Sequence, residues 1–173
     1  MPDAPSPSRF LGIYLNDHLA GSAVGLELAR RAAANNEGTE LGRVLAEIGG
    51  EIEAERASLR QLMDRFGIAE NRFKLAGAWI GERLGRLKLN GRVRGYSPLS
   101  RLVEVEGLCV GIGGKLLLWR SLERTVGELP GFDFAALATQ AESQRARLEP
   151  FRLEAAAACF GEGPGAVSPR RSG

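Results

Sequence analysis

The sequence predicts an all-α protein, a bundle of four long helices with an additional shorter helix in the link between the second and the third. Apolar residues recur at three- and four-residue spacing over four long segments. Short turns join the first two and the last two segments, and a longer link joins the pairs. The 173 residues are 44% hydrophobic and 25% charged, as in a globular domain. We therefore expect one helical domain over residues 10–160.

The first helix is expected over residues 10–34. Asn36 and Gly38 supply the turn after it, and Thr39 can cap the next helix. The polar His18 falls in the apolar band of this helix. The band consists of Leu11, Leu15, Leu19, Ser22, Leu26, Ala29 and Ala33.

The second helix is expected over residues 40–66, and Gly67 provides its stop. Its opposite face carries charges of both signs, which is typical of a solvent-exposed surface. Glu55 interrupts the apolar stripe. The stripe consists of Leu41, Val44, Leu45, Ile48, Ile52, Leu59, Leu62, Met63 and Phe66.

A shorter helix is expected over residues 71–89, followed by a loop over 90–96. Gly77, Gly81 and Gly85 repeat every four residues and leave one side of it smooth. Each glycine costs a helix about 1 kcal/mol relative to alanine. This segment therefore has the weakest helical signal.

The third long helix is expected over residues 97–126, with Pro98 at its first position. It is apolar on two nearly opposite sides, so it either lies centrally or supplies a subunit interface. Glu106 is the polar residue that we place toward the interior. One band holds Val105, Leu108, Ile112, Leu116 and Trp119, and the other holds Leu99, Leu102, Val103, Val110 and Leu117.

The fourth long helix follows the turn at residues 129–131, with Asp133 as its cap. Arg145 interrupts its stripe, and Pro150 is expected to kink the helix or to mark a restart before Phe160. The stripe consists of Phe134, Leu137, Ala138, Ala141 and Leu148.

Residues 1–9 and 161–173 are rich in Pro, Gly and Ser, and we expect both tails to be disordered. The start lacks the basic and then apolar layout of a signal peptide, so a cytoplasmic location is expected. Uncharged runs such as 107–114 are too short to span a membrane. Cys109 and Cys159 are far apart in apolar surroundings, which predicts two free thiols.

Three short segments resemble the ferritin-like superfamily: residues 14–19 (Y-L-N-D-H-L), 51–56 (E-I-E-A-E-R) and 102–106 (L-V-E-V-E). The resemblance implies a four-helix bundle with one long crossover, and metal ligands that project inward from such positions. Di-iron and di-manganese bundles use a carboxylate on two helices and Glu-x-x-His on two others. The sequence has no Glu-x-x-His and a single histidine, His18, so it resembles a degenerate member without the usual ligands.

Each long helix carries one polar residue inside its apolar stripe: His18, Glu55, Glu106 and Arg145. Buried charges are costly unless they are paired. We expect a buried polar network, the remnant of a metal site, in which Arg145 supplies the positive charge that a metal would bring. Two alternatives stay open: ordinary surface pairs, and an iron or manganese site that uses Glu55, Glu106 and His18.

The net charge of +2, from 23 basic and 21 acidic residues, makes a nucleic-acid partner improbable. One basic run can serve as an anion-binding segment, although a solvated face explains it better; it consists of Arg83, Arg86, Lys88, Arg92 and Arg94. The segment 111–115 (G-I-G-G-K) lacks the remaining positions of a phosphate-binding loop, so its glycines are assigned to helix contact.

We therefore expect a non-catalytic ferritin-like bundle without a cofactor that acts as a structural or interaction protein. A homo-oligomer is expected, with a dimer favoured, through the second apolar side of the third long helix. The first alternative is a metal-binding oxidoreductase or storage protein with an altered site. The second is a module that binds an anionic partner through residues 83–94.

Overall fold

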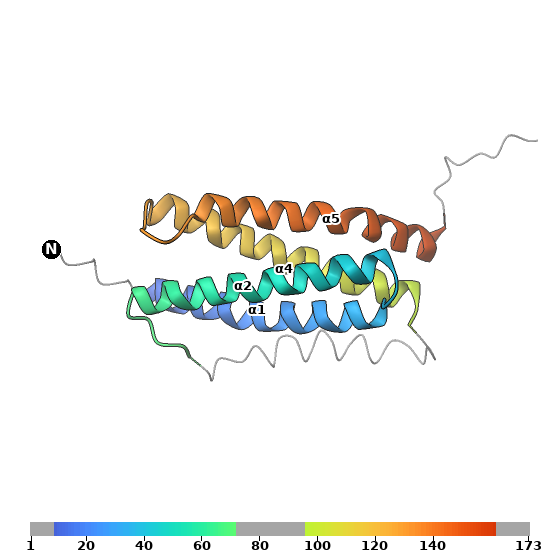
Figure 1. Cartoon of the computed structure of the whole chain (residues 1–173), viewed down its shortest axis with the longest axis horizontal. Coiled ribbons are helices and arrows are strands. Elements are labelled where there is room, and N and C mark those ends of the chain that lie inside the picture. Colours follow the sequence, from blue (N-terminus) through green and yellow to red (C-terminus); the bar gives the residue numbers. More distant parts are fainter. Residues whose placement is uncertain (1–8, 72–95, 162–173) are drawn as a thin grey trace, which may run out of the picture.

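The computed structural model describes residues 9–71 and 96–161, and four helices account for most of them (Figure 1). They are α1 (Arg9–Asn35), α2 (Glu40–Arg65), α4 (Pro98–Thr125) and α5 (Phe134–Phe160). No strand occurs within these two ranges, where one isolated bridge tightens the turn between α4 and α5. The prediction of an all-α chain with four long helices is confirmed.

The helix boundaries follow from caps that the sequence indicates. Thr39, Ser97 and Asp133 precede α2, α4 and α5, and each side chain accepts a hydrogen bond from the backbone N–H three residues further on, at 2.8–3.1 Å. These bonds satisfy donors that a helix N-terminus otherwise leaves unpaired. Pro98, the first residue of α4, needs no such partner.

The turn between α1 and α2 is tight. Asn36 is buried there, and its side-chain amide donates to the carbonyl oxygen of Ala32 at 2.8 Å. The first turn of α2 returns so close that a Cβ atom on Gly42 would lie 2.2 Å from the carbonyl oxygen of Asn36. Only glycine therefore fits at position 42 without a shift of the backbone.

The four helices form two antiparallel pairs, α1 with α2 and α4 with α5, which pack along their length (Figure 1). Helix α1 also contacts α4, and α2 contacts α5 at fewer points. Arg31 bonds Glu104 near one end, so α4 runs antiparallel to α1 and therefore parallel to α2. Two consecutive long helices with the same direction must be joined across the length of the bundle.

The two ends of that connection are anchored at opposite parts of α1. The side-chain oxygen of Asn16 accepts from the backbone N–H of Asn71 at 2.6 Å, and its amide donates to the carbonyl of Ala69 at 3.2 Å. The side chain of Asn36 donates to the hydroxyl of Tyr96 at 2.8 Å. Asn16 and Asn36 are separated by roughly 30 Å of helix at 1.5 Å per residue.

Several predicted features lie outside the described residues. Of the two tails, only Arg9 and Gly161 are described, and Arg9 already belongs to α1. The shorter helix predicted over 71–89 lies outside the described ranges except for Asn71, which is not helical. The basic residues at 83–94 lie outside them as well.

The predicted restart after Pro150 does not occur, since α5 is one helix from Phe134 to Phe160. Proline removes one helical hydrogen bond at a cost of about 3 kcal/mol. Leu148 and Ala155, one turn or so on either side, are both buried in the core. Their packing holds the helix together across the proline.

The core draws on all four helices. Trp119 is its largest side chain, and its ring stacks on Phe134 at a centroid distance of 6.4 Å. The predicted inner band of α4 is buried from Val105 to Trp119. One residue assigned to the outer band, Leu102, is also buried, whereas Leu99, Val110 and Leu117 of that band are exposed.

Candidate functional site

A polar cluster lies inside the apolar core, where α2, α4 and α5 meet. Glu55 on α2 is 3% exposed and Gln144 on α5 is fully buried. Lys115 on α4 extends its ammonium group between them and donates to Glu55 Oε2 and to Gln144 Oε1. The amide of Gln144 donates in turn to Glu55 Oε1 at 3.1 Å. Each of the three side chains thus contacts the other two.

Helical spacing places these three residues inward. Glu55 lies three residues after Ile52 and four before Leu59, and Lys115 stands in the same relation to Ile112 and Trp119. Gln144 lies between Ala141 and Leu148, three and four residues away. Since residues three and four apart share a face of a helix, all three polar groups point to the core with their apolar neighbours.

A second shell connects the cluster to solvent. The amide of Gln144 also donates to Glu51 Oε2 at 2.9 Å, and Arg147 donates to the same carboxylate. Arg147 lies 3.7 Å from Glu47, one turn further along α2. The buried ion pair is therefore the inner end of a row of charges between α2 and α5.

Burial and pairing act in opposite directions on the inner ion pair. Burial raises the pKa of Glu55, and the ammonium group of Lys115 opposes that rise. Burial lowers the pKa of Lys115, and the carboxylate of Glu55 opposes that change. Each group is thus costly to bury alone and is stabilised by the other.

The structure brings only one of the four predicted network residues into this cluster. Glu55 is buried as expected, but Arg145 and Glu106 are exposed. Glu106 lies on the surface 3.5 Å from Arg152. His18 is half-buried on α1, where its ring contacts Tyr14 edge to face at 4.6 Å. The predicted network of His18, Glu55, Glu106 and Arg145 is therefore wrong in three of its members.

The error is one of helix phase. Arg145 was chosen where its neighbour Gln144 faces inward, and Glu106 was chosen although its neighbour Val105 faces inward. A shift of one residue turns a helical side chain by 100°. The sequence does carry a signal for Lys115, because it interrupts the inner band of α4 between Ile112 and Trp119.

The implied metal does not fit this arrangement. Iron and manganese sites in such bundles are built from carboxylates and imidazoles. Here the carboxylate of Glu55 is contacted by an ammonium and an amide, and the predicted set of Glu55, Glu106 and His18 does not converge. Over residues 9–71 and 96–161, no three His, Cys, Asp or Glu side chains are grouped to hold a metal ion.

A second polar cluster joins the end of α1 to the start of α4. The hydroxyl of Tyr96 accepts from Asn36 at 2.8 Å and donates to Glu104 at 3.0 Å. Arg31 bonds the other oxygen of Glu104 at 3.0 Å, and Arg101 bonds Asn36 at 3.1 Å. Burial is the main reason that the pKa of Tyr96 is raised. Sequence reasoning missed this cluster, which fastens α4 to α1.

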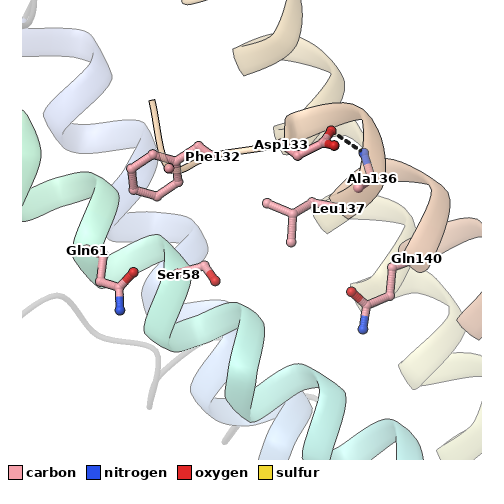
Figure 2. A pocket seen from close by; sticks show the side chains of 8 residues that line it. Ser58, Gln61, Phe132, Asp133, Ala136, Leu137 and Gln140 are labelled. Atoms are coloured by element: carbon pink, nitrogen blue, oxygen red, sulfur yellow. Dashed lines mark hydrogen bonds between the residues drawn. The ribbon is translucent and has the colours of Figure 1, made fainter. Parts of the chain in front are cut away.

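A shallow pocket of about 240 Å³ lies between α2 and the start of α5 (Figure 2). Ser58 and Gln61 come from α2, Gln140 comes from α5, and Phe132 comes from the turn before it. The charged residue of the lining, Asp133, is engaged as the cap of α5. The pocket offers a hydroxyl and amides for hydrogen bonding but no paired acid and base.

Comparisons with known proteins return no relative. No protein-family model, no curated protein and no solved structure matches this chain. Among the helices described, none is long and apolar enough to cross a membrane.

Proposed function

We propose that this chain is a non-catalytic, ferritin-like helical bundle that acts as a structural or interaction protein and self-associates, with a dimer favoured. The observation that carries the proposal is the ammonium group of Lys115 inside the bundle. It contacts Glu55 and Gln144 at the place where the ferritin-like resemblance implies a metal. A cytoplasmic location stays a prediction from the sequence.

The directions of the helices support the ferritin-like assignment. Bundles of that superfamily contain one long crossover, which joins two antiparallel helix pairs. In this chain α2 and α4 run in the same direction, and their ends are anchored near Asn16 and Asn36 at different parts of α1. This arrangement is compatible with such a crossover.

The charge balance of the inner cluster supports a structural role. A carboxylate that binds a metal must offer its lone pairs to the ion. Both oxygens of Glu55 already accept hydrogen bonds, one from Lys115 and one from Gln144. The positive charge that offsets this carboxylate is part of the chain itself.

Exposed apolar side chains support a role in interaction. Leu99, Val110 and Leu117 of α4 are 55%, 67% and 61% exposed. Scattered single apolar residues are common on protein surfaces, but an apolar row on one helix face is typical of an interface. The same row was predicted from sequence as the second apolar side of this helix.

Elemental analysis tests the proposal. The purified protein is incubated with iron(II) or manganese(II), desalted and analysed beside Glu55→Gln and a control, Glu53→Gln, which changes an exposed carboxylate on the same helix. We expect no stoichiometric metal in any of the three proteins. Stoichiometric metal that is retained in Glu53→Gln and lost in Glu55→Gln would instead establish the metal-binding alternative.

A further inference from the structure

An uncharged stripe runs along the outer side of α4. Leu99, Val103, Val110, Leu117 and Ser121 lie within a sector of about 40°, at 100° per residue. The apolar core residues of α4 occupy the opposite side of the helix. No charged residue lies on this stripe over its six turns.

We propose that a second copy of this chain packs on the stripe, with the two α4 helices antiparallel and the two-fold axis beside Val110. The proposal rests on the self-association proposed above and assigns it a surface and a geometry. Three properties of the stripe carry it: its self-complementary pattern, the charges on its flank, and its area.

The pattern of side chains is self-complementary about Val110. In an antiparallel pair, a residue a given number of positions before Val110 faces the residue the same number of positions after it. Val103 then faces Leu117 of the second copy, and Leu99 faces Ser121. Gly107 and Gly114 lie near each other across the contact. Two large side chains thus never compete for one position except at Val110, which lies on the axis.

The charges on the flank that faces α5 also favour the antiparallel arrangement. Glu106 lies before Val110 and pairs with Arg152 of α5, whereas Arg120 lies after it and pairs with Glu142 of α5. An antiparallel pair places the acidic half of one flank beside the basic half of the other. A parallel pair would instead place Glu106 beside its own copy. Opposite charges across an interface select the orientation of the partner.

The area of the stripe predicts a weak dimer. From Leu99 to Ser121 it is about 33 Å long at 1.5 Å per residue, and one helix face is about 10 Å wide. The contact therefore buries about 330 Å² on each copy, less than the roughly 800 Å² of a standard stable interface. The dimer should consequently form and dissociate readily with protein concentration.

Cysteine cross-linking tests the geometry in full-length protein whose own thiols are replaced (Cys109→Ala and Cys159→Ala). We expect Val110→Cys to form disulfide dimers, and a mixture of Val103→Cys with Leu117→Cys to form mainly mixed dimers. An exposed control on α1, Ile13→Cys, should cross-link far less. Preferential 103–103 and 117–117 products, or Val110→Cys yields no higher than the control, would overturn the antiparallel contact.

Sedimentation equilibrium separates this proposal from the general one. We expect Val110→Glu to raise the dimer dissociation constant about tenfold or more, because the charge lies at the centre of the contact. Ile13→Glu should leave it unchanged, and far-UV circular dichroism verifies that both variants are helical. A wild-type dimer that tolerates Val110→Glu would overturn this surface alone. A wild-type protein that stays monomeric at the highest concentration would overturn self-association as well.

Discussion

His18 is half-buried on α1, and its ring contacts Tyr14. Burial lowers the pKa of this imidazole, and the nearby carboxylate of Asp17 opposes the change only in part. The folded chain therefore resists protonation of His18 at a pH where the unfolded chain accepts the proton. A group with a lowered pKa in the folded state stabilises the protein above its unfolded pKa and loses that contribution as the pH falls.

The first prediction concerns this pH dependence. Below about pH 6.5, the usual pKa of histidine, the free energy of unfolding should fall more steeply in the wild type than in His18→Gln. Urea unfolding of both proteins between pH 7.5 and 5.0 measures the difference. Glu55 and Lys115 are present in both proteins, so their titration cancels in the comparison. Parallel curves for the two proteins would show that His18 is not protected from protonation.

Glu55 could be predicted from the sequence, whereas its two partners could not. The apolar residues around Glu55 are numerous and define the phase of α2 without ambiguity. On α5 both Gln144 and Arg145 lie between Ala141 and Leu148, so the pattern does not decide which of them faces inward. Lys115 was read as part of a glycine-rich segment, although its spacing from Ile112 and Trp119 already placed it on the buried face.

Glycines within the helices have different roles that the sequence does not distinguish. Gly42 and Gly50 both lie in α2 and both lower its intrinsic helical stability. The Cβ of a side chain at position 42 would lie 2.2 Å from the carbonyl oxygen of Asn36, whereas position 50 is exposed and has no atom within 4 Å of such a Cβ. Only the folded structure separates the two.

The second prediction contrasts these positions. Gly42→Ala should destabilise the protein by about 2 kcal/mol or more, because the turn between α1 and α2 must move. Gly50→Ala should stabilise it by about 0.5–1 kcal/mol through helix propensity alone. Chemical denaturation of both variants measures the two effects. Equal effects of the same sign would show that the turn is not as close as the structure indicates.

Helix ends could be predicted well because each depends on a few neighbouring residues. Thr39, Ser97 and Asp133 cap their helices where the sequence indicates. The continuity of α5 through Pro150 could not be predicted, since it depends on packing of residues before and after the proline against other helices. Local signals therefore specify where elements start, and tertiary contacts decide whether they continue.

At the scale of the whole molecule, the number of long helices and the inner side of each were accessible from sequence. The clusters that fasten the helices to one another were not. Tyr96, Asn36 and Glu104 come from a loop, a turn and a helix, and only the fold brings them together. The inner cluster likewise takes one residue from each of three helices. Such contacts between distant segments leave no periodic signal in the sequence.

The account as a whole depends on the ion pair at the centre of the bundle. If Lys115 supplies the charge that Glu55 requires, then neither residue can be changed alone without leaving the other buried and unpaired. Removal of one partner of a buried pair costs about 3–5 kcal/mol. An exposed pair such as Arg120 with Glu142, on the surface of α4 and α5, contributes about 1 kcal/mol or less.

The most direct test is a double-mutant cycle of unfolding free energies with Lys115→Met, Glu55→Gln and the double variant, beside Arg120→Met, Glu142→Gln and their double variant. We expect Lys115→Met to cost about 3 kcal/mol or more, and the double variant to cost clearly less than the sum of the single changes. The surface cycle should show a coupling below about 1 kcal/mol. Additive effects of the two core changes would contradict the central role of the pair.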